Sequence, residues 1–463
     1  MNIVNINKII DNVPDYKVFL TVDELDESTM RLQGEFPDIV KVFEAGRSRE
    51  NHRILCLKIG NGRKNALCFA CPHPNEPIGA MTLEYFSRVL AENDEFRVST
   101  GYTWYIIKCV DPDGTKLNEK WFKGPFNIYN YMKNYFRPAS NKQVEWTFPV
   151  DYKNLHFHDT IPETKAMMSL IERIRPKFIY SLHNAGFGGV YWYITEETKE
   201  IYDAMREAAK KQGVPLNLGE PEAPYCVAYS PAIYQNLGIQ QSYDYLEKYG
   251  VEHPEDSIKA GTCSSDYAQD LCGSFTLLTE LPYFYDKRIN DLSEAGITRR
   301  DAVLISLDNS EEADKFIKST LDISIKYMKK NNPFRLALEA FTDNAERNEA
   351  ERKMVKENPD FAKKATVAEE FDNLLVTKFY KMLSYGLLTR ANESELEKMA
   401  ASNEDDKEKK EALTRAFKLA EDRLKALSVE LEEKIHYEVV PIKKLVAIQL
   451  ECGLIMADYL KNN

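Results

Sequence analysis

The sequence lacks several features that mark common classes of protein. No apolar run reaches about eighteen residues, so no segment is expected to span a bilayer. Positive charge is in deficit, because 61 Lys and Arg stand against 73 Asp and Glu, which gives a formal net charge of −12. This balance argues against nucleic acid or an anionic membrane as the main partner. Residues 1–11 lack the basic start, apolar core and small-residue cleavage site of a secretory signal.

Cysteine is also scarce, with eight residues in a chain of 463. The cysteines are scattered, which favours buried free thiols in a reducing compartment, and we therefore predict a cytoplasmic protein. Beyond about residue 310, glycine and strand-like runs nearly vanish, while Glu, Lys, Ala and Leu dominate. The change predicts an α/β domain over residues 1–310, with a mixed, mostly parallel sheet flanked by helices. An all-α bundle is expected over residues 311–463.

Several segments of the C-terminal part carry helix signals. Ser394-Glu-Leu-Glu397 matches a capping box, which predicts that a helix begins there. A long charged helix is expected over residues 407–435. Pro441 opens a last amphipathic helix, whose apolar stripe is Leu445, Ile448, Cys452, Ile455 and Tyr459. Such a stripe needs a partner surface, so we expect it to be buried against another helix or a second subunit. The bundle could pack on the rest of the chain, act as a lid or form a homo-oligomer, and we favour assembly.

The most informative motif is Cys71-Pro-His-Pro-Asn-Glu-Pro77, which holds His73 and Glu76 between a strand and a helix. Residues 65–71 form a short continuous apolar run, which is typical of a buried strand. Pro77 suits a first helical turn. The imidazole and the carboxylate therefore follow the C-terminal end of a strand, where ligands bind in open α/β sheets. Two such groups are half of a catalytic zinc site, which takes three protein ligands and one open position.

Two further apolar runs each end in a histidine or a glutamate. Residues 177–183 end at His183, and residues 275–280 end at Glu280. A charged group at the end of an apolar strand is costly unless it is paired or bound to a metal. Three such endings in one chain favour a shared site over three unrelated accidents.

The order of these groups, a His-x-x-Glu, a distant histidine and a late glutamate, resembles the zinc metallocarboxypeptidases of the carboxypeptidase A type. Asp111-Pro-Asp-Gly114 is similar to the family's Asn-Pro-Asp-Gly turn, and residues 261–266 are similar to its glycine-rich pocket segment. The resemblance covers about residues 25–310. It does not extend to the helical C-terminal part.

The resemblance implies a role for each matching residue. His73, Glu76 and His183 match the zinc ligands, and one Zn²⁺ per chain is expected. Glu280 matches the glutamate that activates the water at the zinc and later protonates the leaving amine. The chemistry is consistent, because zinc lowers the pKa of its water to about 7 and a nearby carboxylate can then accept the proton.

Recognition of a substrate's terminal carboxylate needs a cation, best supplied by an arginine fork. Arg137 lies between the second and third ligands, where the family carries its substrate arginines, and is the candidate for this contact and for a catalytic role. The family uses a second such cation. Lys123 is a candidate for this role, although a solvated surface residue is the more typical interpretation of this lysine. Asn184 and Ser265 are expected to bind substrate, and the uncharged Ser265 gives no support for a charged terminal residue.

The family's mobile tyrosine has no counterpart near Ile258. Tyr267 and Tyr229 are possible substitutes, although each is more typical of packing than of catalysis. This departure leaves the specificity of the site open.

These observations predict a zinc metallocarboxypeptidase that removes the C-terminal amino acid from a peptide with a free carboxylate. One alternative is a zinc amidohydrolase of N-acyl amino acids, similar to aspartoacylase and succinylglutamate desuccinylase. Another is a catalytically silent peptide-binding module. Because no candidate site residue lies in residues 311–463, we expect their deletion to cost solubility and to leave the zinc site intact.

Overall fold

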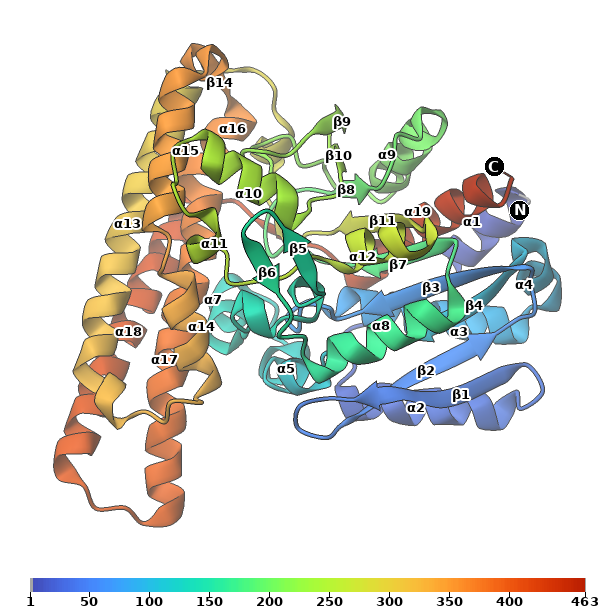
Figure 1. The fold of residues 1–463 in the computed structure, drawn as a ribbon, viewed down its shortest axis with the longest axis horizontal. Coiled ribbons are helices and arrows are strands. Elements are labelled where there is room, and N and C mark those ends of the chain that lie inside the picture. The colour runs from blue at the N-terminus through green and yellow to red at the C-terminus, as the bar shows by residue number, and fades with distance from the viewer. Residues whose placement is uncertain (1–2, 463) are drawn as a thin grey trace.

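The computed structural model describes residues 3–462, and its centre is a nine-stranded mixed sheet (Figure 1). The strands run in the order β1-β2-β4-β3-β7-β11-β8-β10-β9. Their bounds are Val40–Arg47 (β1), Arg53–Ile59 (β2), Lys64–Ala70 (β3), Tyr102–Ile107 (β4), Phe178–Leu182 (β7), Tyr191–Ile194 (β8), Ala228–Ser230 (β9), Ile233–Gln235 (β10) and Phe275–Glu280 (β11).

The middle of the sheet is parallel and its margins are mostly antiparallel. Strand β3 pairs in parallel with β4 and β7, and β7 pairs in parallel with β11. Strands β1, β2 and β8 join this centre through antiparallel pairs. From β3 the chain goes first to β4 on one side and later to β7 on the other, so the strand order reverses at β3. Ligands bind at the carboxyl ends of strands next to such a reversal.

Both faces of the central strands are apolar, which explains why their sequences read as continuous apolar runs. In β3, Cys68 points into one hydrophobic cluster, while Leu67 and Phe69 point into another. In β7, Tyr180 belongs to the same cluster as Cys68, and Ile179 belongs to the same cluster as Leu67. Helices cover both faces. On one face lie α2 (Val22–Glu35), α3 (Ile78–Glu92), α9 (Tyr202–Lys211) and α19 (Ile442–Asn462), and on the other α8 (Pro162–Ile174) and α12 (Ser264–Cys272). The expected α/β architecture with flanking helices is confirmed.

Shorter elements fill the connections. The helices are α1 (Ile3–Asp11), α4 (Asp94–Thr100), α5 (Pro112–Lys116), α6 (Glu119–Phe122), α7 (Ile128–Asn134), α10 (Ile239–Lys248) and α11 (Pro254–Ser257). Three small ribbons pair β5 (Val150–Tyr152) with β6 (Leu155–Phe157), β12 (Phe284–Tyr285) with β15 (Glu438–Val439), and β13 (Glu294–Thr298) with β14 (Lys364–Thr366).

The C-terminal part is helical, as its composition predicts, and stands against one end of the sheet (Figure 1). Its long helices are α13 (Arg299–Ser324), α17 (Thr377–Ser402) and α18 (Lys407–Lys434), with α14 (Pro333–Phe341), α15 (Ala345–Glu357) and α16 (Val367–Phe371) beside them. Helix α13 runs through residue 310, and residues of both parts share one hydrophobic cluster. A π-helical turn, Asp372–Val376, joins α16 to α17.

The predicted helix start at Ser394 is wrong, because Ser394 lies inside α17. Its hydroxyl donates to the carbonyl of Ala391, three residues earlier in the same helix. The residue that does begin the next helix is Asp406, which accepts from the backbone N–H of Lys409. A capping motif marks a helix start only where the preceding residues leave the helix, and residues 377–393 do not. The long helix expected from residue 407 is confirmed.

Helix α19 returns to the sheet rather than joining the other C-terminal helices. It packs on α3 and α9 and on strands β7 and β11. Ile448 and Cys452 of its apolar stripe are fully buried there, so the partner surface that the stripe needs lies within the same chain. Among residues 3–462, no helix combines the length and the apolar character that crossing a membrane requires.

Candidate metal centre

Three neighbouring parallel strands bring the predicted residues to one edge of the sheet. His73 and Glu76 follow β3, His183 follows β7, and Glu280 is the last residue of β11. Because β3, β7 and β11 are adjacent and parallel, their carboxyl ends meet. The sheet order, which sequence spacing alone does not reveal, therefore explains why residues more than 200 positions apart gather at one place.

A tight turn after β3 aims His73 and Glu76 at the same point. Cys71 adopts a left-handed backbone conformation (φ 53°), and the N–H of Glu76 donates to the carbonyl of His73 at 3.1 Å. Gly79, in the first turn of helix α3, lies against the sheet. A β-carbon on Gly79 would lie 2.6 Å from that of Leu182, so only glycine lets the helix approach this closely.

His73, Glu76 and His183 form a compact buried group. Each offers one ligand atom, and these atoms all lie within 4.8 Å of one another. The Nδ1 atom of His183 is 3.0 Å from Oε2 of Glu76, and the two imidazole rings are 4.9 Å apart at their centres. The three residues are 1–4% exposed. Two nitrogens and a carboxylate at this spacing are the donor set of a catalytic zinc site.

The remaining ring nitrogens are held by neighbouring side chains. The Nε2 atom of His183 lies 2.8 Å from the hydroxyl of Ser181, and the ring of His73 bonds to the side chain of Gln143. The Nδ1 atoms of both histidines are buried and have no hydrogen-bond partner. Burial, and then the positive charge of Arg137, lowers the pKa of His73 well below its ordinary value. Two buried imidazoles whose Nδ1 atoms lack a hydrogen-bond partner, beside a carboxylate, fit a divalent metal.

Glu280 stands beside this group. Its Oε1 is 3.8 Å from Nδ1 of His183, and its Oε2 is buried without a hydrogen-bond partner. Burial, and then the negative charges of Glu76 and Glu222, raises the pKa of Glu280 well above its ordinary value. A carboxylate that ionises reluctantly is a better proton acceptor than an exposed one, which is the property a general base needs.

Arg137 lies at the site but is partly engaged there. Its Nη1 donates to Oε1 of Glu76 at 3.2 Å, and its Nε donates to the side chain of Gln143 at 3.3 Å. Its pKa is raised: burial alone would lower it, and the negative charges of Glu76 and Glu280 outweigh that effect. One of its three nitrogens thus holds a proposed metal ligand, Glu76, and a second holds Gln143. The two-point fork expected for a carboxylate is reduced to the contact that Nη2 can offer.

Asn184 and Ser265 also line the site, but their polar atoms are occupied. The Oδ1 of Asn184 accepts from the N–H of Ile78, and its backbone N–H donates to Glu76. This gives Asn184 a positioning role. The hydroxyl of Ser265 accepts from Nδ2 of Asn236 at 2.7 Å.

Three other candidates lie outside the cavity lining. Lys123 pairs with Glu24 on the surface, and Tyr267 donates to Glu172. Neither they nor Tyr229 are among the described residues that line the site. Their ordinary interpretations, solvation and packing, are the ones that the geometry favours.

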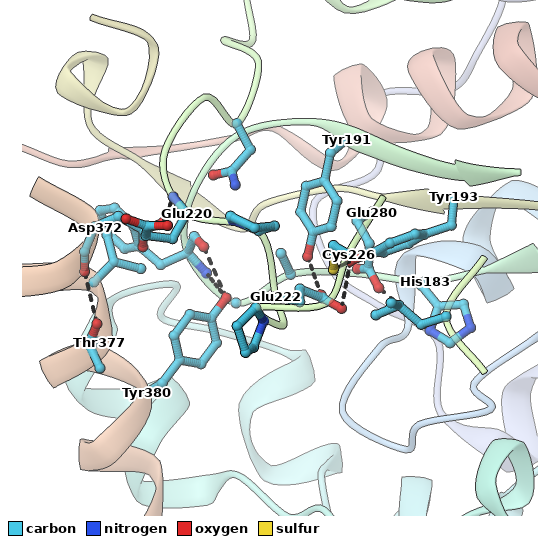
Figure 2. A pocket seen from close by; sticks show the side chains of 18 of the residues that line it. His183, Tyr191, Tyr193, Glu220, Glu222, Cys226, Glu280, Asp372, Thr377 and Tyr380 are labelled. Atoms are coloured by element: carbon cyan, nitrogen blue, oxygen red, sulfur yellow. Dashed lines mark hydrogen bonds and ion pairs between the residues drawn. The ribbon is translucent and has the colours of Figure 1, made fainter. Parts of the chain in front are cut away.

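The site opens into a cavity of about 850 Å³ that the C-terminal helices help to enclose. Figure 2 shows side chains that line it. Helices α13, α15 and α17 and the π-helical turn before α17 contribute much of its wall. The charged residues on the lining are Glu76, Arg137, Glu145, Glu220, Glu222, Glu280, Arg299, Glu351, Asp360, Asp372 and Lys381. The bundle therefore packs on the rest of the chain and forms part of the cavity wall, while its role in assembly stays a prediction.

Tyr380 of α17 is a cavity residue that sequence reasoning misses. Its hydroxyl donates to the carbonyl of Phe187 at 2.9 Å and accepts from the N–H of the same residue at 3.3 Å (Figure 2). It therefore ties the helical wall to the glycine-rich loop after His183. The sequence carries no signal for this role, because a tyrosine beside the stripe of an amphipathic helix looks like any surface residue.

Gln449 of α19 supports the site from the other side. Its Nε2 donates to the carbonyl of His183 at 3.2 Å, and its Oε1 accepts from the hydroxyl of Thr82 at 2.8 Å. The hydroxyl of Tyr180 donates to its backbone carbonyl. Gln449 is fully buried, so all three contacts are shielded from water.

The family model for zinc carboxypeptidases matches residues 25–270 of this sequence. The chain belongs to the zinc carboxypeptidase family. The match includes His73, Glu76 and His183 and ends before β11, so Glu280 lies outside it. Zinc carboxypeptidase A 1 from Anopheles gambiae is 27% identical over 237 residues, which are 44% of this chain and 53% of the relative. The chain thus spans about half the length of the curated relative that it matches.

Solved structures of carboxypeptidases also match. Carboxypeptidase A from Helicoverpa armigera is 18% identical, with a TM-score of 0.39 over 57% of this chain and 65% of that one. A metallo-carboxypeptidase from Burkholderia cenocepacia is 16% identical, with a TM-score of 0.34 over 59% of this chain and 61% of that one.

Proposed function

We propose that this member of the zinc carboxypeptidase family is a zinc-dependent peptidase that removes the C-terminal amino acid from a peptide. The observation that carries the proposal is the buried group of two imidazoles and a carboxylate beside a second, unpartnered carboxylate. Family membership supports a hydrolase of peptide bonds.

His73, Glu76 and His183 would hold one zinc ion. When bound there, zinc supplies a Lewis acid for the scissile carbonyl and lowers the pKa of a bound water. Ser181 and Gln143 keep the outer ring nitrogens occupied, so each histidine presents Nδ1 to the ion. Arg137 and the backbone N–H of Asn184 hold the two oxygens of Glu76.

Glu280 is the proposed general base and acid. It accepts a proton from the attacking water and delivers that proton to the leaving amine nitrogen. Its buried, unpartnered Oε2 is free for the first of these contacts. The elevated pKa of the carboxyl suits both directions of transfer.

We infer that the site takes the end of a peptide rather than its middle, because the helical wall from α13 to α17 borders it. The Nη2 of Arg137 is the nitrogen left to meet an oxygen of the substrate, either of the scissile carbonyl or of the terminal carboxylate.

The test compares zinc-loaded wild type, the Glu280→Gln variant and chelator-treated protein on three substrates. These are an N-blocked dipeptide, its C-terminal amide and an N-acetyl amino acid. We expect the dipeptide to be cleaved and the amide to be cleaved far less. Glu280→Gln should retain zinc and lose kcat by at least about 100-fold, because an amide cannot accept the proton.

Each alternative has its own outcome. Cleavage mainly of the N-acetyl amino acid would indicate the amidohydrolase. No turnover by fully zinc-loaded protein would indicate the binding module. An unchanged kcat for Glu280→Gln would remove Glu280 from its role.

A further inference from the structure

Arg390 of helix α17 is a buried cation whose hydrogen-bond acceptors are backbone carbonyls. It is 6% exposed. Its Nη1 donates to the carbonyls of Asn134 at 2.8 Å and Tyr135 at 2.9 Å, and its Nη2 donates to that of Leu117 at 2.7 Å. None of these three acceptors is a carboxylate, and burial lowers the pKa of Arg390 to about 10. Because a buried charge is costly, the segments that supply its acceptors indicate what Arg390 holds in place.

The three carbonyls lie at the ends of two short helices. Asn134 is the last residue of α7 and Tyr135 follows it, while Leu117 follows the last residue of α5. The last carbonyls of a helix have no partner within that helix. A guanidinium carries several donors in one plane, so it can meet carbonyls of two segments at once. Arg390 therefore joins the ends of α5 and α7 to helix α17.

A close helix crossing brings Arg390 to this place. Helix α17 packs against α7 (Figure 1). A β-carbon on Gly386 would lie 1.9 Å from the carbonyl oxygen of Met132 in α7, so only glycine permits this approach. Arg390 follows Gly386 by four residues and therefore lies on the same face of α17, one turn further along. The crossing thus sets the guanidinium at the end of α7.

The segment that Arg390 holds leads directly to Arg137. Between them, Phe136 has its N–H and its carbonyl bonded to the side chain of Asn118, both at 2.9 Å. The ring of Phe136 packs edge-on against that of Phe334 in α14, with 5.3 Å between the ring centres. The guanidinium of Arg390 lies 4.4 Å from the centre of the same Phe334 ring. Contacts with α14 and α17 therefore fix the chain immediately before Arg137.

The contacts that Arg137 makes through its own side chain are long. Its Nη1 is 3.2 Å from Glu76 and its Nε is 3.3 Å from Gln143, whereas N–H···O bonds are most often about 2.9–3.0 Å long. Two weak contacts do not hold a long, flexible side chain firmly. The backbone from which Arg137 extends must therefore help to set the direction of its Nη2.

We propose that Arg390 is a positioning residue that acts through Arg137. By fixing the backbone of residues 134–136, it directs the guanidinium of Arg137 toward the substrate. This inference rests on the proposed function, in which Nη2 of Arg137 meets a substrate oxygen. Arg390 lies outside residues 25–270, which the family model matches, so the C-terminal helices contribute to the site through this residue.

The first test needs no turnover. It follows the Nε–H signal of Arg137 by NMR in full-length, zinc-loaded protein that carries isotope-labelled arginine. The signal is identified by its loss in Arg137→Lys. Arg390→Met should move the signal toward the position of exposed arginines and speed its exchange with water at least about tenfold, because the bond from Nε to Gln143 is lost. An unchanged signal and exchange rate would overturn the proposal.

Arg300→Met is the matched control. Arg300 of α13 also donates to backbone carbonyls, those of Val355 at 3.0 Å and Asn358 at 3.4 Å. Its loss should lower Tm and leave the signal of Arg137 in place. If the control moved that signal as far as Arg390→Met does, a general loosening of the helices would be the cause, and the proposal would be wrong.

Kinetics with saturating zinc separate positioning from general stability. On the N-blocked dipeptide, Arg390→Met should lower kcat/KM about 10- to 100-fold, the loss expected when a contact to the substrate is misplaced. Arg390→Lys should recover part of this loss, because an ammonium still donates to carbonyls. In an Arg137→Ala background, Arg390→Met should change kcat/KM less than about twofold, since the group that it positions is gone. Equal losses in both backgrounds would show that Arg390 does not act through Arg137.

The remaining outcomes also decide between the proposals. Where Arg390→Met does not fold, Arg390→Lys takes its place in the NMR test; if neither folds, Arg390 serves the fold as a whole and the inference is wrong. If the wild type cleaves no peptide while Arg390→Met still releases Arg137, the peptidase function is wrong and the positioning of Arg137 stands. If the wild type cleaves the dipeptide and Arg390→Met keeps both the signal and the rate, the function stands and the inference is wrong.

Discussion

Two parts of the C-terminal region, helix α19 and the helices from α13 to α18, meet the sheet in different ways. Helix α19 lies on one face of the sheet, where Leu445, Ile448 and Leu454 are almost completely buried. Helices α13 and α17 stand at one end of the sheet (Figure 1). Their residues line part of the cavity. The first supports the strands that carry the ligands, and the second shapes the space in front of them. Composition alone marks both as helical and does not separate these roles.

The largest effect is expected from removing α19. Deletion of residues 441–463 should abolish soluble folded protein, because burying one large apolar side chain contributes about 1.5–3 kcal/mol and a domain has about 5–15 kcal/mol in total. This reverses the expectation from sequence that the C-terminal residues can be lost without harm to the zinc site. Soluble yield and circular dichroism measure the result. A soluble truncated protein that binds zinc would show that α19 is not needed to support the strands that carry the metal ligands.

A smaller effect is expected from Gln449→Leu. The substitution keeps an apolar contact with the sheet and removes the bonds to the carbonyl of His183 and to Thr82. Zinc affinity should fall about tenfold, as it does when groups behind metal ligands are lost. Competition with a chelator dye measures it.

Ile448→Val is the control for this variant. It removes one methyl group from the neighbouring position and should cost about 0.5–1.5 kcal/mol of stability with zinc affinity unchanged. If both variants weaken zinc binding in proportion to their loss of Tm, Gln449 acts only through stability.

On the wall, Tyr380→Phe should leave zinc affinity unchanged and reduce kcat/KM about fivefold. The hydroxyl holds both backbone groups of Phe187, and one hydrogen bond contributes about 1 kcal/mol. Tyr327→Phe, in the same helical region and bonded to the exposed Glu408 on the surface, is the control. If Tyr380→Phe lost zinc affinity, helix α17 would support the metal ligands as α19 does, and the proposed difference between the two would be wrong.

The smallest effect concerns pH. Burial, and then the charge of Glu220, raises the pKa of Asp372 to about 7. Because the folded pKa exceeds the unfolded one, the contribution of Asp372 to stability is fully present below about pH 4 and is lost as the pH rises through 7. Asp372→Asn should therefore raise Tm by about 1–2 °C at pH 8 and leave it unchanged at pH 4. An equal shift at both pH values would exclude titration of Asp372 as the cause.

The sequence predicted the parts of the site that follow directly from local pattern. Strand β11 has the bounds expected from the apolar run that ends at Glu280, and the runs before His73 and His183 are strands as well. Short continuous apolar runs are reliable here because helices cover both faces of the sheet. The shared site was predictable because each of the three strands ends in a ligand or an acid.

The rest depended on distant contacts. The engagement of Arg137 with Glu76 and Gln143 requires the fold of residues 137–143 over the ligand loop, which no spacing reveals. Glu145 and Glu222 look like ordinary acidic residues in the sequence, and only the fold places them on the cavity wall. The misplaced helix start at Ser394 has the opposite cause, since a local motif there was overruled by a helix that packs along its whole length.

The position of Gln449 also sets an order of events during synthesis. The ligand loop at residues 71–77, the strand before His183 and Glu280 are all translated well before residue 449. Until that residue leaves the ribosome, the carbonyl of His183 and the hydroxyl of Thr82 lack their buried partner. A nascent chain therefore carries its metal ligands long before it can hold them rigidly. Of the contacts described at this site, the support from α19 is the one that depends on the most recently translated residues.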